Sequence, residues 1–339
     1  MIFRYRAYGL VLESPSGIES LVPGADHGDS AIRPIEVSVG SCPFWACEAL
    51  KLPATPLYPA SAKPDAQPTF RLQRLGAGAF FRLSYADGTQ FVTDGEALRI
   101  WGDCPAILTS EDLTTYLLGP VMGFVLRRRG ILALHASCFS LGGCAFAICG
   151  GARTGKSTTI AALALRGNPV LCEDIAAVRE RASIFCVAPG YPRINLWPDS
   201  VAKLFPSDAD LPKITPNWDK RFLSLDGHPA KFESQERPLV AIYLLEPRSN
   251  APDAPRIEEV SPQDAVLLLV QNTYMNYLLE KQQRADEFDA IARLVSQVPV
   301  RRLVPSSDPA KISAMCELLE ANAANSSGPA TGSSASRPA

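Results

Sequence analysis

Short runs of alternating apolar and polar residues, ended by glycine, proline or aspartate, fill the first hundred residues of the chain. Alternation with a period of two is typical of strands that bury one face. In FFRLSYADGTQFVT, two such runs flank Asp87-Gly88 and predict a β-hairpin. We therefore expect a β-rich N-terminal domain over residues 1–105, with strands over Ala7–Glu13, Ile35–Val39 and Phe80–Tyr85.

Beyond residue 105 the apolar positions follow helical and continuous patterns. A helix is predicted over Glu111–Arg129, because Ser110 can cap it, acidic residues open it, arginines close it and Gly130 follows. The apolar runs ILALHASCF and CAFAICG, joined by a glycine turn, predict a second hairpin. The other expected elements are strands in VLCED and PLVAIYLLE and helices over Lys156–Arg166, Pro262–Leu279 and Asp308–Asn322.

This mixture of helices and strands predicts an α/β fold with a mixed sheet for residues 106–322. The sheet is expected to be mixed because the second hairpin lies where an ordinary nucleotide-binding unit would begin with a single parallel strand. Residues 323–339 are small and polar, cannot bury apolar area, and predict a disordered tail.

Composition and charge narrow the classes of function. A hydrophobic content of 47% supports a large core, and a formal net charge of −2 with scattered cations argues against nucleic acid as a partner. No apolar run is long enough for a membrane span, and the first residues lack the pattern of a secretion signal. We therefore expect a cytoplasmic protein that does not bind a membrane, with its nine cysteines as free thiols.

The segment CGGARTGKSTT carries the chemistry that the chain displays most clearly. It fits G-x-x-x-x-G-K-[ST], follows a predicted strand and opens a predicted helix, which is the context in which backbone N–H groups converge on phosphate oxygens. The motif predicts ATP and Mg²⁺ as cofactors, with Lys156 reaching the phosphates and Ser157 the metal. The residues expected to hold the nucleotide are Gly150, Gly151, Ala152, Arg153, Thr154, Gly155, Lys156, Ser157 and Thr158.

Two further features are expected near this loop. Glu173 and Asp174 follow the predicted helix and one short strand, so the chain returns them toward the loop. One carboxylate, Asp174 in our assignment, would bind the metal with Ser157, and either of the two would accept a proton from a hydroxyl substrate. His135 lies in the strand that pairs with the one leading into the loop, which brings its imidazole toward the same site.

The order of His135, hairpin, phosphate loop, helix, strand and acidic pair resembles HPr kinase/phosphorylase. The resemblance covers residues 130–205 and implies a P-loop core related to that of PEP carboxykinase. It also implies ATP-dependent phosphorylation of a protein serine. Two departures are visible: Glu173-Asp174 stands where that family has two aspartates, and its later Glu-Ile-Arg-Gly signature is missing, which makes the reverse reaction doubtful.

A narrower resemblance concerns the HPr-kinase-like enzymes of lasso peptide clusters. YRAYGLVLES, PGYPRINLWPDS and DKRFLSL look like segments of those kinases, which phosphorylate a hydroxyl, typically the C-terminal serine of a precursor peptide. A precursor peptide or small protein with an acceptor serine is thus the expected partner, and the N-terminal domain is a candidate for recognising it. The alternatives are a regulatory HPr kinase of carbohydrate metabolism, a nucleotide-binding regulator without transferase activity, and a small-molecule or carboxykinase-like enzyme.

Cations after the acidic pair are the remaining candidates for catalysis. Arg193, counted among the catalytic residues with Glu173, Asp174, His135 and Lys156, could neutralise charge on the transferred phosphoryl group. Lys220 and Arg221 are candidates for the same role, whereas Trp197 is expected in the core and Thr158 is expected to pack or cap the helix. The sequence does not determine the oligomeric state, and a homo-oligomer is compatible with it.

Overall fold

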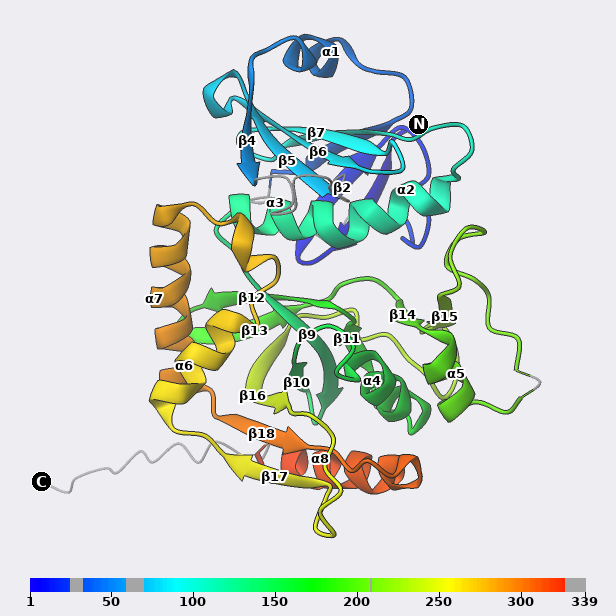
Figure 1. Ribbon diagram of the computed structural model, residues 1–339, viewed down its shortest axis with the longest axis vertical. Coiled ribbons are helices and arrows are strands. Elements are labelled where there is room, and N and C mark those ends of the chain that lie inside the picture. The colour runs from blue at the N-terminus through cyan, green and yellow to red at the C-terminus, as the bar shows by residue number, and fades with distance from the viewer. Residues whose placement is uncertain (25–32, 59–69, 208, 327–339) are drawn as a thin grey trace, which may run out of the picture.

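The computed structural model describes residues 1–24, 33–58, 70–207 and 209–326. Two eight-stranded sheets dominate it, one above the other in Figure 1, with a long helical segment between them. The first sheet has the strand order β1-β2-β3-β8-β7-β6-β5-β4. Its strands are β1 (Phe3–Ala7), β2 (Leu10–Ser14), β3 (Ile35–Val39), β4 (Ala54–Tyr58), β5 (Phe70–Leu75), β6 (Phe80–Tyr85), β7 (Gln90–Asp94) and β8 (Arg99–Asp103).

The second sheet is mixed, as expected, with parallel pairs β10–β16 and β16–β18 among antiparallel ones. Because β10 pairs with both β9 and β16, the strands β10, β9, β12, β13 and β16 close into a ring. The strands of this sheet are β9 (Leu132–Leu141), β10 (Cys144–Cys149), β11 (Val170–Cys172), β12 (Ile175–Arg181), β13 (Ile184–Ala188), β16 (Arg237–Leu245), β17 (Arg256–Glu259) and β18 (Val300–Val304), and a small separate hairpin contains β14 (Arg193–Leu196) and β15 (Arg221–Ser224).

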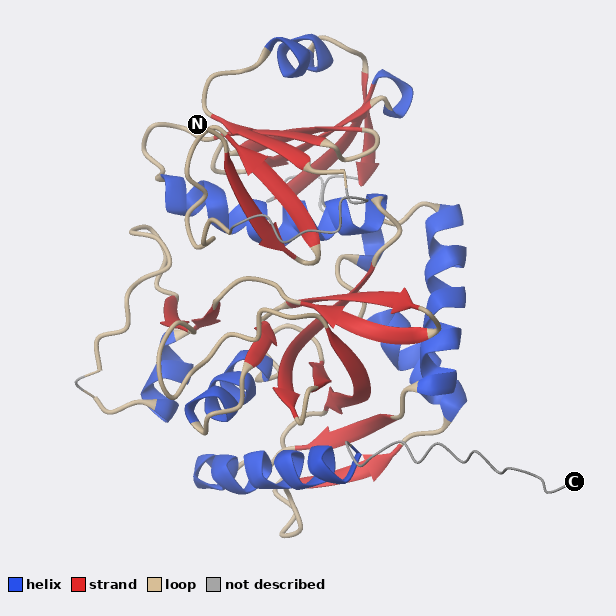
Figure 2. Ribbon diagram, turned by 180° about the vertical axis from the view of Figure 1, so that it is seen from behind, coloured by secondary structure: helices blue, strands red, loops and turns tan. Residues whose placement is uncertain are grey.

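Helices cover both sheets, as the view from behind also shows (Figure 2). None of the helices in the described ranges is long and apolar enough to cross a membrane. They are α1 (Phe44–Leu50), α2 (Ser110–Tyr116), α3 (Met122–Arg128), α4 (Lys156–Leu165), α5 (Pro198–Leu204), α6 (Pro262–Gln271), α7 (Lys281–Gln297) and α8 (Ile312–Ser326), with a π-helical turn at Leu117–Val121 and 3-10 turns at Gly76–Gly78, Asn276–Leu278 and Pro309–Lys311.

The helical segment α2–α3 packs against the first sheet. Leu117 and Val125 of this segment share one buried cluster with Leu12 and Leu83 of the sheet and with Ala177 of β12. The hydrophobic core therefore continues across residue 105, where the sequence suggests a domain boundary.

Most predicted elements are present, including both hairpins, β3, β6, α4 and β16. The helix predicted from residue 111 is present but is interrupted by the π-helical turn at Pro120, and Thr109, not Ser110, caps it. The strand predicted over Ala7–Glu13 is wrong, because Tyr8 and Gly9 have positive φ and turn the chain between β1 and β2.

Other expectations fail toward the C-terminus and for the cysteines. The helix predicted to Leu279 ends at Gln271, and α7 was not predicted. Residues 323–326 of the predicted tail belong to α8, whereas 327–339 lie outside the described residues. Cys42 and Cys47 form a disulfide at the start of α1, so the expectation of nine free thiols is wrong for this pair. The free thiols are Cys104, Cys138, Cys144, Cys149, Cys172, Cys186 and Cys316.

Candidate active site

The predicted phosphate loop connects the buried strand β10 to the first residue of α4. Arg153 and Gly155 have φ angles of 65° and 112°, so the loop turns through the left-handed region twice before the helix begins. Gly150 has no room for a side chain, because a Cβ there would lie 2.9 Å from Thr154 Oγ1. The loop thus leads tightly into α4, whose first N–H groups have no partner within the helix, and such groups at a helix N-terminus are a site for phosphate.

Lys156, the first residue of α4, folds back over this loop. Its ammonium group donates hydrogen bonds to the carbonyl oxygens of Gly150 and Gly151 at 2.8 and 2.9 Å. The side chain is 6% exposed, and its burial lowers the pKa of the ammonium group, although the nearby Asp174 and Glu173 carboxylates offset part of this effect. A positive charge is thus held at the centre of the loop.

The acidic pair lies at a sharp turn between β11 and β12. Asp174 has a φ of 76°, and the N–H of Ile175 donates to the carbonyl oxygen of Glu173 at 2.9 Å. This is a three-residue γ-turn, which is rare for a non-glycine residue because its backbone is strained. Neighbouring side chains of a strand point to opposite faces, but this turn brings both carboxylates to the loop.

The two carboxylates have different partners. Ser157 Oγ donates to Glu173 Oε1 at 2.6 Å, whereas His135 Nε2 lies 3.1 Å from Asp174 Oδ1. The predicted metal pair was Ser157 with Asp174, so the structure brings a different carboxylate to the serine hydroxyl. The Asp174 side chain remains 45% exposed, which leaves it within reach of a substrate.

His135 reaches Asp174 because β9 pairs with both neighbouring elements of the site. Its Cα lies opposite that of Ile175 in β12, and the carbonyl oxygen of His135 accepts the N–H of Gly150 at 3.4 Å. The ring of Tyr274 meets the imidazole edge-on at 5.8 Å between ring centres. The imidazole is therefore held in place from two sides.

The surroundings shift the pKa values of the two carboxyl groups in opposite directions. Burial raises the pKa of Glu173, and the negative charge of Asp174 raises it further. Partial burial would raise the pKa of Asp174 as well, but the hydrogen bond and the charge of His135 outweigh it and hold this pKa below its usual range. Two neighbouring carboxyl groups whose pKa values are pushed apart are typical of sites in which they have different roles.

Lys220 acts on both carboxyl groups, whereas Arg221 is occupied elsewhere. The positive charge of Lys220 lowers the pKa of both Glu173 and Asp174, and its ammonium group lies 4.9 Å from the ring centre of Trp197. Trp197 is 46% exposed, so the prediction that it lies in the core is wrong. Arg221 donates to the carbonyl oxygen of Leu211 at 2.9 Å and ties down its own loop.

Arg193 is buried without a carboxylate partner in the described part of the chain. It is 9% exposed, its guanidinium group lies over the rings of Phe222 at 4.9 Å and Tyr191 at 5.8 Å, and its Nε has no hydrogen-bond partner. Burial raises the pKa of Tyr191 to about 12, the charge of Glu173 raises it further and the charge of Arg193 lowers it, so Tyr191 lies near both groups. A buried cation of this kind is suited to an anionic ligand.

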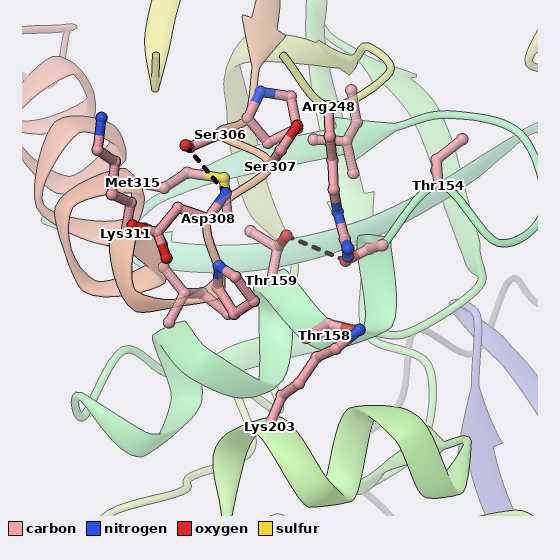
Figure 3. Close-up of a pocket in the computed structure, with 15 residues that line it drawn as sticks. Thr154, Thr158, Thr159, Lys203, Arg248, Ser306, Ser307, Asp308, Lys311 and Met315 are labelled. Atoms are coloured by element: carbon pink, nitrogen blue, oxygen red, sulfur yellow. Dashed lines mark hydrogen bonds between the residues drawn. The ribbon is translucent and has the colours of Figure 1, made fainter. Parts of the chain in front are cut away.

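A hollow lies beside the loop and the start of α4, and the sequence did not predict it (Figure 3). Gly155 and Thr158 border it, and Lys203 and Arg248 extend into it. Arg248 follows β16, which lies parallel to β10, so its place beside the loop follows from that pairing. The far wall is formed by Pro305, Ser306, Ser307, Asp308, Pro309, Lys311, Ile312 and Met315.

The residues present suit a magnesium ion with a nucleotide. Mg²⁺ is usually held by one or two carboxylates together with substrate phosphates and water, and the Ser157–Glu173 oxygen pair offers such a partial shell. The described residues contain no group of three or more His, Cys, Asp or Glu side chains that could hold a metal. A metal here would therefore depend on phosphate oxygens for the rest of its ligands.

Comparisons with known proteins return one kind of match. No protein-family model matches the chain, and no curated protein matches it. Among solved structures, the chain is similar to the HPr(Ser) kinase/phosphatase from Coxiella burnetii, with 14% sequence identity and a TM-score of 0.30 over 57% of this chain and 91% of that one. A similarity at this level assigns no residue roles to this chain.

Proposed function

We propose that the chain is an ATP- and Mg²⁺-dependent kinase that transfers the γ-phosphoryl group to a hydroxyl, and that residues 106–322 form a P-loop core of the HPr kinase type. The observation that carries the proposal is the convergence of two pairs, Ser157–Glu173 and His135–Asp174, on a loop that holds Lys156 at its centre. A nucleotide-binding regulator without transferase activity needs the loop to bind the nucleotide. It does not need a second carboxylate, oriented by a histidine, to accept a proton.

The residues have separate roles in this proposal. The loop N–H groups and Lys156 bind the phosphates, and Ser157 and Glu173 hold the metal, which neutralises charge on the phosphate oxygens. Asp174, oriented by His135, accepts the proton of the acceptor hydroxyl. The hydroxyl oxygen forms a bond to the γ-phosphorus as the bond from that phosphorus to the bridging oxygen breaks, and ADP leaves. This exchanges the roles of the two carboxylates relative to the metal assignment made from the sequence.

Arg193 and the hollow support a nucleoside triphosphate as the donor. Arg193 would pair with phosphate oxygens, since its guanidinium group has no carboxylate partner in the described ranges. The hollow would take the nucleoside, with Lys203 and Arg248 at its phosphate end. Its wall contains prolines, an isoleucine and a methionine, which are suitable for covering the face of a purine.

We propose that the acceptor is the C-terminal serine of a lasso peptide precursor. The precursor would bind from the side of the first sheet. The segment that carries Lys220 contacts α2 twice: Asn217 Nδ2 donates to Asp112 Oδ2 at 2.7 Å, and the rings of Trp218 and Tyr116 meet at 5.8 Å between centres. Because α2 packs against the first sheet and Tyr116 donates to Asp87 Oδ2 at 2.7 Å, these contacts join the segment of Lys220 to the N-terminal part of the chain, which supports a role for that part in acceptor recognition.

Mass spectrometry of a panel of precursor peptides and of HPr protein, incubated with the chain, ATP and Mg²⁺, tests this proposal. We expect the mass of one phosphate on a peptide serine, lost in Lys156→Ala and Asp174→Asn and retained in the control Arg221→Gln. Phosphate on HPr alone would favour the regulatory kinase. ATP binding without transfer to any acceptor would favour the regulator and contradict the kinase.

A further inference from the structure

A second charged cavity lies at the far end of β12 from the acidic pair. We call it the arginine cleft and define it by Arg33, Arg128, Arg129 and Arg179, with Glu96 at its edge. Arg179 follows Asp174 by five residues in the chain, which corresponds to about 16 Å at the rise of a strand. The cleft joins the first sheet to the second, because Arg179 belongs to β12 and Glu96 to the turn between β7 and β8.

Backbone carbonyl groups hold two of these arginines in place without neutralising them. Arg128 donates to the carbonyl oxygen of Gly95 at 2.9 and 3.3 Å. Arg129 donates to that of Ala97 at 3.1 and 3.3 Å and to that of Arg33 at 3.3 Å. A carbonyl dipole orients a guanidinium group but leaves its full charge in the cleft.

Arg179 reaches the cleft from the other sheet. Gly9, with a φ of 68°, lies directly against it: a Cβ at this position would be 3.0 Å from the Arg179 Cζ. The Arg179 Nε is buried and has no hydrogen-bond partner. The turn between β1 and β2 therefore packs on a guanidinium group with unused donor capacity.

Cations outweigh anions in the cleft. Arg33 pairs with Glu96 at 3.5 Å, with both side chains about three-quarters exposed, and Arg128 lies 3.9 Å from Glu280. Neither Arg129 nor Arg179 has an ion pair within the described ranges. Burial lowers the pKa of both groups. For Arg179, the charges of Arg181 and Arg129 lower it further and Glu236 offsets part of this, whereas for Arg129 the charge of Arg33 lowers it and those of Asp94 and Glu96 raise it.

We propose that the arginine cleft is a binding site for a small anion of the phosphate class with at least two charges, held between Arg129 and Arg179. Planar guanidinium groups match the oxygens of phosphate, and an anion would relieve the repulsion between cations that the protein holds together. The helix C-terminus that carries Arg128 and Arg129 accounts for part of the positive charge, but Arg179 comes from a different sheet. An anion bound here would link the two sheets.

Isothermal titration with inorganic pyrophosphate, without added metal, tests this site. It is carried out on the Lys156→Ala chain, so that the phosphate loop does not contribute and the result is independent of the kinase proposal. We expect one pyrophosphate per chain, with an affinity that falls as sodium chloride is added. In the same background, Arg129→Gln or Arg179→Gln should weaken binding by about tenfold or more, the size typical of one charge-assisted hydrogen bond.

Two controls keep the test decisive. Arg237→Gln in β16 removes a cation that is already paired with Glu233 at 2.9 Å and does not line the cleft, so it should leave the affinity unchanged. Arg179→Lys keeps the charge and should recover part of the binding. Equal affinity in Arg179→Gln and Arg237→Gln, or no pyrophosphate bound while an acidic peptide binds, would overturn the proposal. The second result would identify the cleft as a protein-binding surface.

Discussion

The hydrogen bond between Ser157 and Glu173 makes the metal assignment testable. If these two oxygens hold the metal together, Ser157→Ala and Glu173→Gln should weaken nucleotide binding only when Mg²⁺ is present. The double variant should then lose little more than either single variant, because the second oxygen cannot complete the shell without the first. Ser157→Ala removes the hydroxyl oxygen of the pair, and Glu173→Gln removes the negative charge of the carboxylate.

The structure sets the size of the expected effect. The bond is 2.6 Å long and joins a hydroxyl to a carboxylate, which is the short, charge-assisted kind. Hydrogen bonds to charged groups contribute about 1.5–3 kcal/mol, which corresponds to roughly a tenfold to hundredfold change in affinity. We therefore expect the coupling energy between the two substitutions to fall in this range when Mg²⁺ is present and to be near zero in EDTA.

Titration with a fluorescent ATP analogue, with Mg²⁺ and with EDTA, measures both quantities. Asp174→Asn is the matched control, since it removes the neighbouring carboxylate, whose partner is His135. It should leave Mg²⁺-dependent binding unchanged and abolish transfer. The reasoning is refuted if Asp174→Asn removes the Mg²⁺ dependence and Glu173→Gln does not, or if the two single effects add in full.

Three further predictions concern the same site. Lys220→Ala should reduce turnover by about tenfold with little effect on ATP binding, because it removes a charge beside both carboxylates. Steady-state kinetics of the control Arg221→Gln, which loosens the same loop, would show whether a change in the loop alone lowers turnover. Glu173→Gln should raise the thermal midpoint near pH 8, by roughly 1.5 °C if the gain is about 1 kcal/mol. Because a carboxyl group with a raised pKa loses its stabilising contribution as pH rises, this gain should vanish near pH 4. A gain that does not change with pH would contradict this. Asp174→Gly should be more stable than Asp174→Ala by about 1 kcal/mol in urea unfolding, because only glycine adopts a φ of 76° without cost, and equal stability would mean that the turn relaxes.

Local patterns predicted most of the fold. Both hairpins and the helix after the loop were found because their signals lie within a few residues of each other. The strand expected over Ala7–Glu13 failed because Tyr8, an aromatic residue typical of strands, adopts a positive φ in the turn. Tertiary contacts stabilise that conformation: the Tyr8 N–H donates to the carbonyl oxygen of Pro189, and the Tyr8 hydroxyl donates to that of Leu118.

The candidate site could be predicted only in part, for a related reason. The loop, the acidic pair and His135 lie within one stretch of chain, so their meeting follows from the order of the elements. Arg248 and the C-terminal wall of the hollow come from segments roughly 90 to 160 residues after the loop, and their approach depends on which strands pair. Which carboxylate meets Ser157 depends on a single backbone angle, and no sequence pattern specifies that angle.

That angle links the strain of the turn to the chemistry proposed for the site. In a regular strand, Glu173 and Asp174 would point to opposite faces, and only one could reach the loop. The γ-turn at Asp174 costs about 1–3 kcal/mol of backbone strain. It brings one carboxylate to Ser157 and the other to His135, so that one can hold a metal while the other remains open to a substrate. Glycine would relieve the strain but would supply no carboxylate. The presence of aspartate in a conformation that favours glycine is therefore best explained by a need for the side chain at this position.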